Sequence, residues 1–179
     1  SKIDLVYVSL DGFTASTVDH SRGREGSFQK AMEAIEAFQL AGVTVSVASV
    51  LHSGNAEEIV ELADWLHERG MQMVVQPLYQ NFGNVEYNVD WWKDSPFFPK
   101  SPTEIESLCD VLDTLTRYSM QGRGVVNPAA QFQAMKFHFS HPTKDAGVSC
   151  RAGHSDISID PQGRIRLCYF LEPVGNFSD

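Results

Sequence analysis

The sequence predicts an α/β protein in which parallel strands alternate with helices, followed by further helices and a small β-hairpin that carries two cysteines. The first 80 residues contain three apolar segments of strand length, with segments of helical periodicity between them. Near the end of the chain, two short alternating segments flank a turn sequence, as in a β-hairpin. At 179 residues, the chain is long enough to bury a core in one domain with a small extension.

Three strands and two helices are predicted in the first 80 residues. The predicted strands span residues 3–10, 43–51 and 71–78. The first strand is almost continuously apolar, as expected for a parallel strand covered on both faces. A polar loop is expected from this strand to about Gly26, followed by a helix that stops at Gly42. Asn55, with Glu58 three residues later, is expected to cap the second helix, which ends at Gly70. Repeated strand–helix–strand units predict parallel pairing in chain order.

The segment from residue 80 to residue 100 has no regular periodicity and includes the aromatic side chains of Trp91, Trp92, Phe97 and Phe98. Long irregular segments of this kind are often lids or binding loops. These aromatic side chains are therefore expected either to line a pocket or to pin the loop to the surface.

Two more helices are predicted after this segment. Ser101 and Glu104 form a capping pair around Pro102 at the start of the first of them. The second helix covers residues 128–139. Cys109 lies at the edge of the apolar stripe of the first helix, where we expect it to act as a small buried hydrophobic side chain.

The predicted hairpin lies between Cys150 and Cys168 in the sequence CRAGHSDISIDPQGRIRLCYF. Ile157 and Ile159 alternate with polar neighbours, the turn follows at residues 160–163, and the alternation then resumes. Because a hairpin brings its ends together, we expect the two thiols to be neighbours. Paired thiolates suit zinc or an iron–sulfur cluster. A disulfide and two unrelated buried cysteines are the alternatives.

The composition bears on the partners and the compartment. The chain has 14 basic and 23 acidic residues, a formal net charge of −9, which argues against nucleic acid or an anionic membrane surface as a partner. No segment approaches the roughly 18 apolar residues of a membrane-spanning helix. Three cysteines do not make a disulfide scaffold, so a reducing cytoplasm is expected.

Polar side chains follow the first predicted strand. Ser9 and Asp11 stand at its carboxyl end, where functional groups gather in parallel βα architectures. Arg22 and Arg24 follow in the next loop, and a guanidinium there can bind a carboxylate through two hydrogen bonds. Together these features are typical of a pocket for a small zwitterionic molecule. Taken singly, an Asp-Gly pair at a strand end is usually a turn, and an arginine in a loop is usually solvated.

The order of these motifs resembles the radical S-adenosylmethionine (SAM) enzyme superfamily. VSLDG, RGREGSF, a helix ending in AGV, the strand VSVASVL and a helix ending in ERG are similar to the second half of its partial (βα) barrel. Cys150, Gly163 and Cys168 resemble the opening of the auxiliary-cluster extension of the SPASM or twitch type. The resemblance implies a barrel half with its last helix over residues 1–126, and a connecting helix with the start of the auxiliary-cluster domain over residues 127–179.

The resemblance also implies cofactors, partners and site residues. In this superfamily a C-x3-C-x2-C loop binds a 4Fe–4S cluster that chelates SAM, and cleavage of SAM yields a 5′-deoxyadenosyl radical. An electron donor such as flavodoxin or ferredoxin is implied as a partner. By position, the implied SAM-binding residues are Ser9, Asp11, Arg22, Arg24 and Leu78, and the implied auxiliary-cluster ligands are Cys150 and Cys168.

The sequence also departs from the family pattern. No C-x3-C-x2-C motif occurs, because the three cysteines stand 41 and 18 residues apart. We therefore expect an internal piece of a longer enzyme that is inactive alone and exposes the edge of its first strand. The leading hypothesis is a radical SAM oxidoreductase that abstracts hydrogen from a peptide or small molecule. The alternative is a non-catalytic βα interaction module with a zinc-stabilised hairpin.

Overall fold

The computed structural model describes residues 3–80, 88–148, 152–154, 157–168 and 171–178, and the chain divides into two compact units. The first unit covers the residues up to 79 together with residues 89–146, and the second covers the remainder. This division differs from the boundary predicted after residue 126, because the helix at Ala129–Ser140 packs against the helix at Pro102–Met120 within the first unit.

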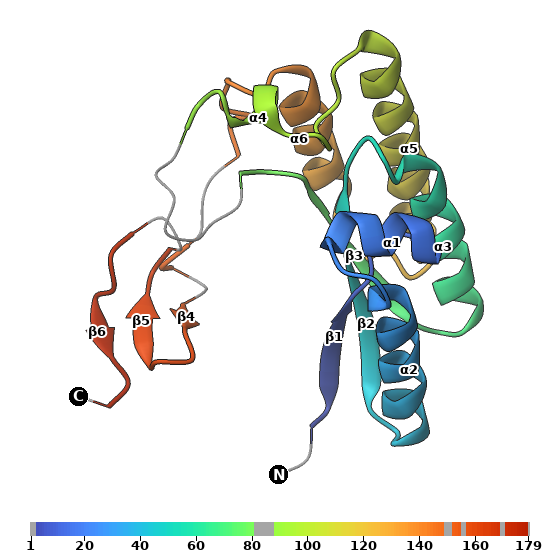
Figure 1. Cartoon of the computed structure of the whole chain (residues 1–179), viewed down its shortest axis with the longest axis vertical. Helices are drawn as coiled ribbons and strands as arrows, with labels where there is room; N and C mark the ends of the chain where they lie inside the picture. Colours follow the sequence, from blue (N-terminus) through green and yellow to red (C-terminus); the bar gives the residue numbers. More distant parts are fainter. Residues whose placement is uncertain (1–2, 81–87, 149–151, 155–156, 169–170, 179) are drawn as a thin grey trace. The chain divides into compact units, whose positions relative to one another are not determined.

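The first unit is built on three parallel strands in chain order (Figure 1). Its elements are β1 (Leu5–Ser9), α1 (Ala15–Arg22), α2 (Ser27–Leu40), β2 (Thr44–Leu51), α3 (Ala56–Glu68), β3 (Gln72–Pro77), α4 (Trp91–Asp94), α5 (Pro102–Met120) and α6 (Ala129–Ser140). In the register, Val8 pairs with Val47, and Val47 pairs with Met73. The predicted parallel pairing in chain order is confirmed.

Beside β3, the backbone around Val125 forms a parallel β-bridge with Met73, which the sequence did not predict. The backbone N–H of Met73 donates to the carbonyl of Gly124 at 2.8 Å, and the N–H of Val126 donates to the carbonyl of Met73 at 3.0 Å. The buried Asn127 side chain continues this ladder, since its Oδ1 accepts from the N–H of Val75 at 2.7 Å and its Nδ2 donates to the Val75 carbonyl at 2.9 Å. The connection from β3 through α5 thus returns the chain to a single parallel bridge beside β3.

The two faces of the sheet differ. Helix α2 contacts β1 and β2, and α3 contacts β2 and β3, so that the helices cover one face (Figure 1). The other face, here called the open face, leaves five side chains of β1 and β3 exposed: Leu5, Tyr7, Ser9, Gln72 and Gln76. The expectation that the first strand is covered on both faces is therefore wrong, and β1 is an exposed edge of the three-stranded sheet.

Helix α1 replaces part of the polar loop that was expected up to Gly26. Thr14 caps its N-terminus by accepting a hydrogen bond from the N–H of Thr17, and Gly23 ends it with a φ of 61°. Val18 is its one buried side chain among the described residues. An eight-residue helix with so little apolar periodicity gives no signal in the sequence, because its position depends on contacts with other elements.

The aromatic segment before α5 is anchored in the core. Phe98 is 1% exposed, and its ring centroid lies 5.3 Å from that of Trp91 and 5.7 Å from that of Phe139. For these side chains the structure favours the pinning role over a pocket lining. The capping pair of α5 is confirmed, because Ser101 Oγ accepts from the Glu104 N–H and the Glu104 carboxylate accepts from the Ser101 N–H.

The second unit contains the predicted hairpin. Strands β4 (Ser158–Ile159) and β5 (Arg164–Arg166) pair antiparallel around the turn, and β6 (Gly175–Asn176) pairs with β5. Gly163 has a φ of 79° in the turn, a conformation that favours glycine. Within the described residues, none of the helices combines the length and the apolar character that crossing a membrane requires.

Candidate functional site

The carboxyl ends of β1, β2 and β3 meet at one edge of the sheet, here called the carboxyl rim, because parallel strands point the same way. Ser9 ends β1 and is exposed on the open face. Leu78 follows β3, and its N–H donates to the carbonyl of Leu51 at the end of β2 at 3.0 Å. Ser9 and Leu78 therefore belong to the same rim, as predicted from the strand order.

Asp11 joins β1 to β2 at this rim. Asp11 is 5% exposed, and its Oδ1 accepts a hydrogen bond from the backbone N–H of Val50 at 2.8 Å. Its Oδ2 forms an ion pair with Arg22 Nη2 at 2.7 Å. Burial raises the pKa of the Asp11 carboxyl above its ordinary value, and the hydrogen bond from Val50 and the charge of Arg22 offset only part of this effect.

Arg22 lies in the last turn of α1 and reaches the rim through Asp11. Its side chain is 36% exposed, and one terminal nitrogen is engaged by the Asp11 carboxylate. A guanidinium has five N–H donors, so the arginine retains donors for an anionic group of a ligand. Arg22 and Asp11 are the two predicted site residues that the structure brings into direct contact.

Arg24 is not brought into this cluster. Its backbone N–H donates to the carbonyl of Asp19 at 3.0 Å in the turn after α1, and its side chain is exposed. It forms no ion pair with any residue that the structure describes. Of the two predicted arginines, Arg22 is thus the one that the fold holds at the rim.

Leu78 is held in place by a histidine of α6. The Leu78 carbonyl lies 2.8 Å from Nε2 of His138 on α6. Because a carbonyl oxygen can only accept, Nε2 carries the proton and donates to it, and burial lowers the pKa of His138, which favours the neutral imidazole. The contact fixes the backbone of Leu78 at the end of β3, while its side chain is half-buried.

Asn55 does not cap α3 as predicted. Its side chain makes no capping hydrogen bond to the helix, and it is 1% exposed beneath the rim. Its Nδ2 donates to the carbonyls of Asp11 at 2.7 Å and Val50 at 2.8 Å, and its Oδ1 accepts from the N–H of His52 at 2.9 Å. An amide side chain suits this place, because it can donate to the Asp11 and Val50 carbonyls and accept from the His52 N–H at the same time.

Glu58, the second member of the predicted capping pair, binds the start of α1 instead of Asn55. Its carboxylate accepts the backbone N–H groups of Phe13 at 2.6 Å and Thr14 at 2.9 Å, and also the hydroxyls of Thr14 and Thr17. Burial acts to raise the pKa of Glu58, but these hydrogen bonds outweigh it and the pKa lies below its ordinary value. A Cβ at Gly12 would come within 2.7 Å of Glu58 Oε2, so this approach requires glycine.

His52 is a buried residue of the rim that was not among the predicted site residues. It is 3% exposed, its Nδ1 accepts from the N–H of Gly54 at 3.1 Å, and its Nε2 lies 2.8 Å from the Oγ of Ser21. Its ring packs on Phe97 with centroids 4.9 Å apart. Burial, with a smaller contribution from the charge of His20, lowers the pKa of His52 from 6.5 to about 4.

This pKa predicts a pH dependence of stability. Because the folded pKa lies below the unfolded one, the stabilising contribution of neutral His52 is full above pH 6.5 and is lost as the pH falls from 6.5 towards about 4. Between pH 7 and pH 5 we expect the wild-type chain to lose about 1–2 kcal/mol of unfolding free energy that His52→Gln does not lose. Urea unfolding at both pH values measures the difference. The exposed His67→Gln is the control and should behave as wild type; an equal loss in His52→Gln would contradict the expectation.

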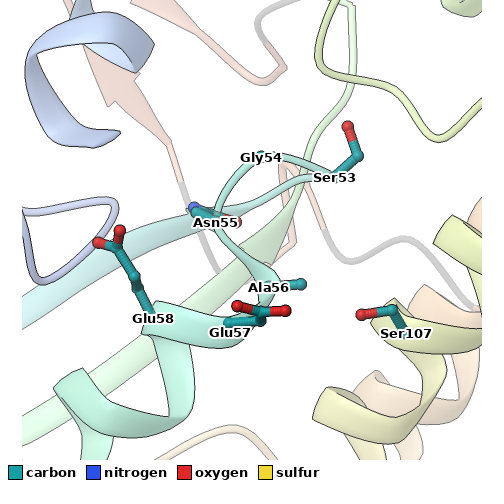
Figure 2. Close-up of a pocket in the computed structure, with 7 residues that line it drawn as sticks. All are labelled: Ser53, Gly54, Asn55, Ala56, Glu57, Glu58 and Ser107. Carbon is teal, nitrogen blue, oxygen red and sulfur yellow. The ribbon is translucent and has the colours of Figure 1, made fainter. Parts of the chain in front are cut away.

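A pocket of about 270 Å³ lies at the N-terminus of α3, opposite Ser107 of α5 (Figure 2). It is lined by Ser53, Gly54, Asn55, Ala56, Glu57, Glu58 and Ser107. None of the predicted SAM-binding residues lines this pocket.

The predicted auxiliary-cluster ligands are only partly described. Cys168 follows β5 and is half-buried, whereas Cys150 lies outside the described residues, so their proximity stays a prediction. Cys109 on α5 is partly buried in the first unit, and burial raises the pKa of its thiol. In the described part of the chain, no three His, Cys, Asp or Glu side chains are arranged to hold a metal ion.

Comparison with known proteins adds a fold assignment. No protein-family model and no curated protein matches the chain. Streptococcus suis SuiB is similar in structure with a TM-score of 0.58 and 16% identity over 92% of this chain and 37% of SuiB. SuiB bound to S-adenosylmethionine is similar with a TM-score of 0.57 and 16% identity, over 92% of this chain and 36% of SuiB. Native anSMEcpe with bound AdoMet (S-adenosylmethionine) and the Cp18Cys peptide is similar with a TM-score of 0.53 and 17% identity, over 98% of this chain and 48% of anSMEcpe.

The chain therefore spans less than half the length of each of these proteins. At such low identity the likeness concerns the fold, and it confirms the predicted fold class of a partial (βα) structure with parallel strands. The chain shares this fold with proteins whose structures hold S-adenosylmethionine.

Proposed function

We propose that this chain forms the SAM-binding part of a radical SAM oxidoreductase with an auxiliary iron–sulfur cluster. The observation that carries the proposal is the gathering of Ser9, the Asp11–Arg22 ion pair and Leu78 at one rim of a parallel sheet. The fold shared with SAM-bound structures and the motif order of the radical SAM superfamily support it.

The residues at the rim fit the chemistry of SAM. SAM carries a carboxylate, an ammonium group, a ribose and an adenine. Arg22 retains guanidinium donors for the carboxylate, and the exposed hydroxyl of Ser9 can bond to the ribose or the amino-acid moiety. Leu78 offers an apolar side chain for the adenine at the same rim. Asp11 holds Arg22 and partly neutralises it, which suits a ligand that is itself a zwitterion.

Together with a 4Fe–4S cluster, bound SAM supplies hydrogen-abstraction chemistry. The role proposed for this chain is to bind and orient SAM: Arg22 and Ser9 fix the amino-acid end, and Leu78 excludes water from the adenine end. We propose a peptide as the substrate in preference to a small molecule, because the structure of anSMEcpe with AdoMet also holds a peptide. An electron donor such as flavodoxin or ferredoxin completes the proposed system.

Metal content and SAM binding together test the proposal. After anaerobic purification of the intact protein we expect iron with visible absorption, and SAM binding that is measurable by equilibrium dialysis. Zinc without iron, combined with no binding of SAM, would favour the interaction module with a zinc-stabilised hairpin. A C-x3-C-x2-C loop in the coding sequence upstream of Ser1 would support the superfamily independently.

The auxiliary site has its own test at Cys168. Cys168→Ser is expected to lower the iron content, because a thiolate ligand is lost. Cys109→Ser is the matched control and should retain full iron content, since this thiol is partly buried on α5 and its raised pKa disfavours the thiolate. Equal iron content in the two variants would remove Cys168 from the proposed ligands.

A further inference from the structure

Helix α1 is fastened to the chain segment after β2 at both of its ends. At its start, the hydroxyls of Thr14 and Thr17 and two backbone N–H groups donate to the carboxylate of Glu58. At its last turn, Ser21 contacts His52. Because Val18 is the one buried side chain of this eight-residue helix among the described residues, apolar packing alone does not define the position of its last turn.

The hydrogen bond between His52 and Ser21 has a defined direction. Nδ1 of His52 accepts the N–H of Gly54 at 3.1 Å, so in the neutral ring the proton is on Nε2. Nε2 then donates to Ser21 Oγ at 2.8 Å. The lowered pKa of His52, about 4, keeps this tautomer neutral at neutral pH. The imidazole thus links the loop after β2 to the last turn of α1.

Ser21 directly precedes Arg22, whose guanidinium pairs with Asp11 at 2.7 Å. The last turn of α1 is therefore attached to the rim at two adjacent residues, by Ser21 to the loop after β2 and by Arg22 to the end of β1. We propose that His52 and Ser21 are positioning residues for Arg22, which hold its guanidinium where the carboxylate of SAM would bind. The proposal rests on the function proposed above, and neither residue is required to touch SAM.

Ser21→Ala tests the link with the smallest change of structure. It removes the acceptor of the His52 hydrogen bond without changing the Arg22 side chain itself. We expect the Kd for SAM, measured by equilibrium dialysis on the intact protein, to rise about threefold to tenfold. Ser16→Ala is the matched control, because Ser16 lies on the same helix, is exposed and has no side-chain hydrogen bond within the described residues.

A second comparison asks whether the effect passes through Arg22. If Ser21 acts by positioning Arg22, then Ser21→Ala should not weaken SAM binding further in an Arg22→Ala background. A general loosening of the fold would instead raise the Kd by the same factor in both backgrounds. Such an equal rise, or a Ser21→Ala affinity equal to that of Ser16→Ala, would overturn the proposal.

Two substitutions of His52 separate its two hydrogen bonds. The amide nitrogen of His52→Gln can replace Nε2 as the donor to Ser21, whereas the amide oxygen of His52→Asn can replace Nδ1 as the acceptor for Gly54. We expect His52→Asn to raise the Kd for SAM as much as Ser21→Ala, and His52→Gln to stay within about twofold of wild type. If His52→Gln raised the Kd for SAM more than His52→Asn, the hydrogen bond from Gly54 in the loop would be the important one, and the positioning role of His52 would be overturned.

SAM-binding measurements distinguish a failure of the proposed function from a failure of the positioning role of Ser21 and His52. No SAM binding by the unsubstituted protein would overturn the proposed function and this inference together. SAM binding that depends on Arg22 but not on Ser21 would retain the proposed function and overturn this inference alone.

Discussion

Replacing Arg22 by alanine is expected to weaken SAM binding by about 1.5–3 kcal/mol, which is roughly a 10- to 150-fold rise in the Kd. The carboxylate of SAM would lose its charge-assisted hydrogen bonds, and no other cationic side chain of the described residues is paired at the rim with Asp11. Equilibrium dialysis or titration calorimetry on the intact enzyme measures the effect. The iron content should stay unchanged, because Arg22 is not a proposed iron ligand.

Two variants serve as controls for Arg22→Ala. Arg22→Lys should recover only part of the affinity, because an ammonium group cannot form the two parallel hydrogen bonds of a guanidinium. Arg24→Ala removes the same side chain from an exposed position without an ion pair among the described residues, so SAM affinity should be retained. A loss of affinity in Arg24→Ala with none in Arg22→Ala would transfer the role to Arg24. Unchanged affinity in the double variant would exclude both arginines from the site.

Asn55→Ala is expected to lower the unfolding free energy by about 3–5 kcal/mol. The amide is 1% exposed and satisfies two backbone carbonyls and one backbone N–H. Truncation leaves these three groups at the rim without their partner, and each buried unsatisfied group costs about 1–3 kcal/mol. Urea unfolding followed by circular dichroism measures the change.

Gln133→Ala is the matched control for Asn55, since it removes an exposed amide from α6 and should change the stability by less than about 0.5 kcal/mol. Asn55→Asp keeps the acceptor for the His52 N–H but places a carboxylate against two carbonyl oxygens, so it should not restore the stability. A loss below about 1 kcal/mol in Asn55→Ala would show that water or a rearranged loop satisfies these groups.

Much of the fold could be predicted because its signals are local. Apolar strands joined by amphipathic helices leave parallel pairing as the simple solution, and β1, β2 and β3 pair in this way. Ser101 and Glu104 are close in sequence, and their predicted capping pair is present. The turn at residues 160–163 likewise predicted the pairing of β4 with β5.

The same capping signature failed at Asn55 and Glu58. Both side chains form hydrogen bonds with residues 41 to 45 positions away in the sequence: Asp11, Phe13, Thr14 and Thr17. A motif shows which hydrogen bonds are locally possible, but it does not show which distant donors and acceptors will compete for the same atoms. The α1 helix escaped prediction for the same reason, because its ends are held by those distant partners.

At the candidate site, the sequence by itself determined that Ser9, Asp11 and Leu78 stand at strand ends and that Arg22 follows in the segment after the first strand. Only the tertiary structure decided that Arg22 rather than Arg24 pairs with Asp11, and that His52 is buried against Ser21. The physical reason is that strand ends are set by local periodicity, whereas ion pairs and burial depend on which segments the fold brings together. His52 lies 31 residues from Ser21 in sequence and 2.8 Å from it in space, a relation that no spacing pattern in the chain encodes.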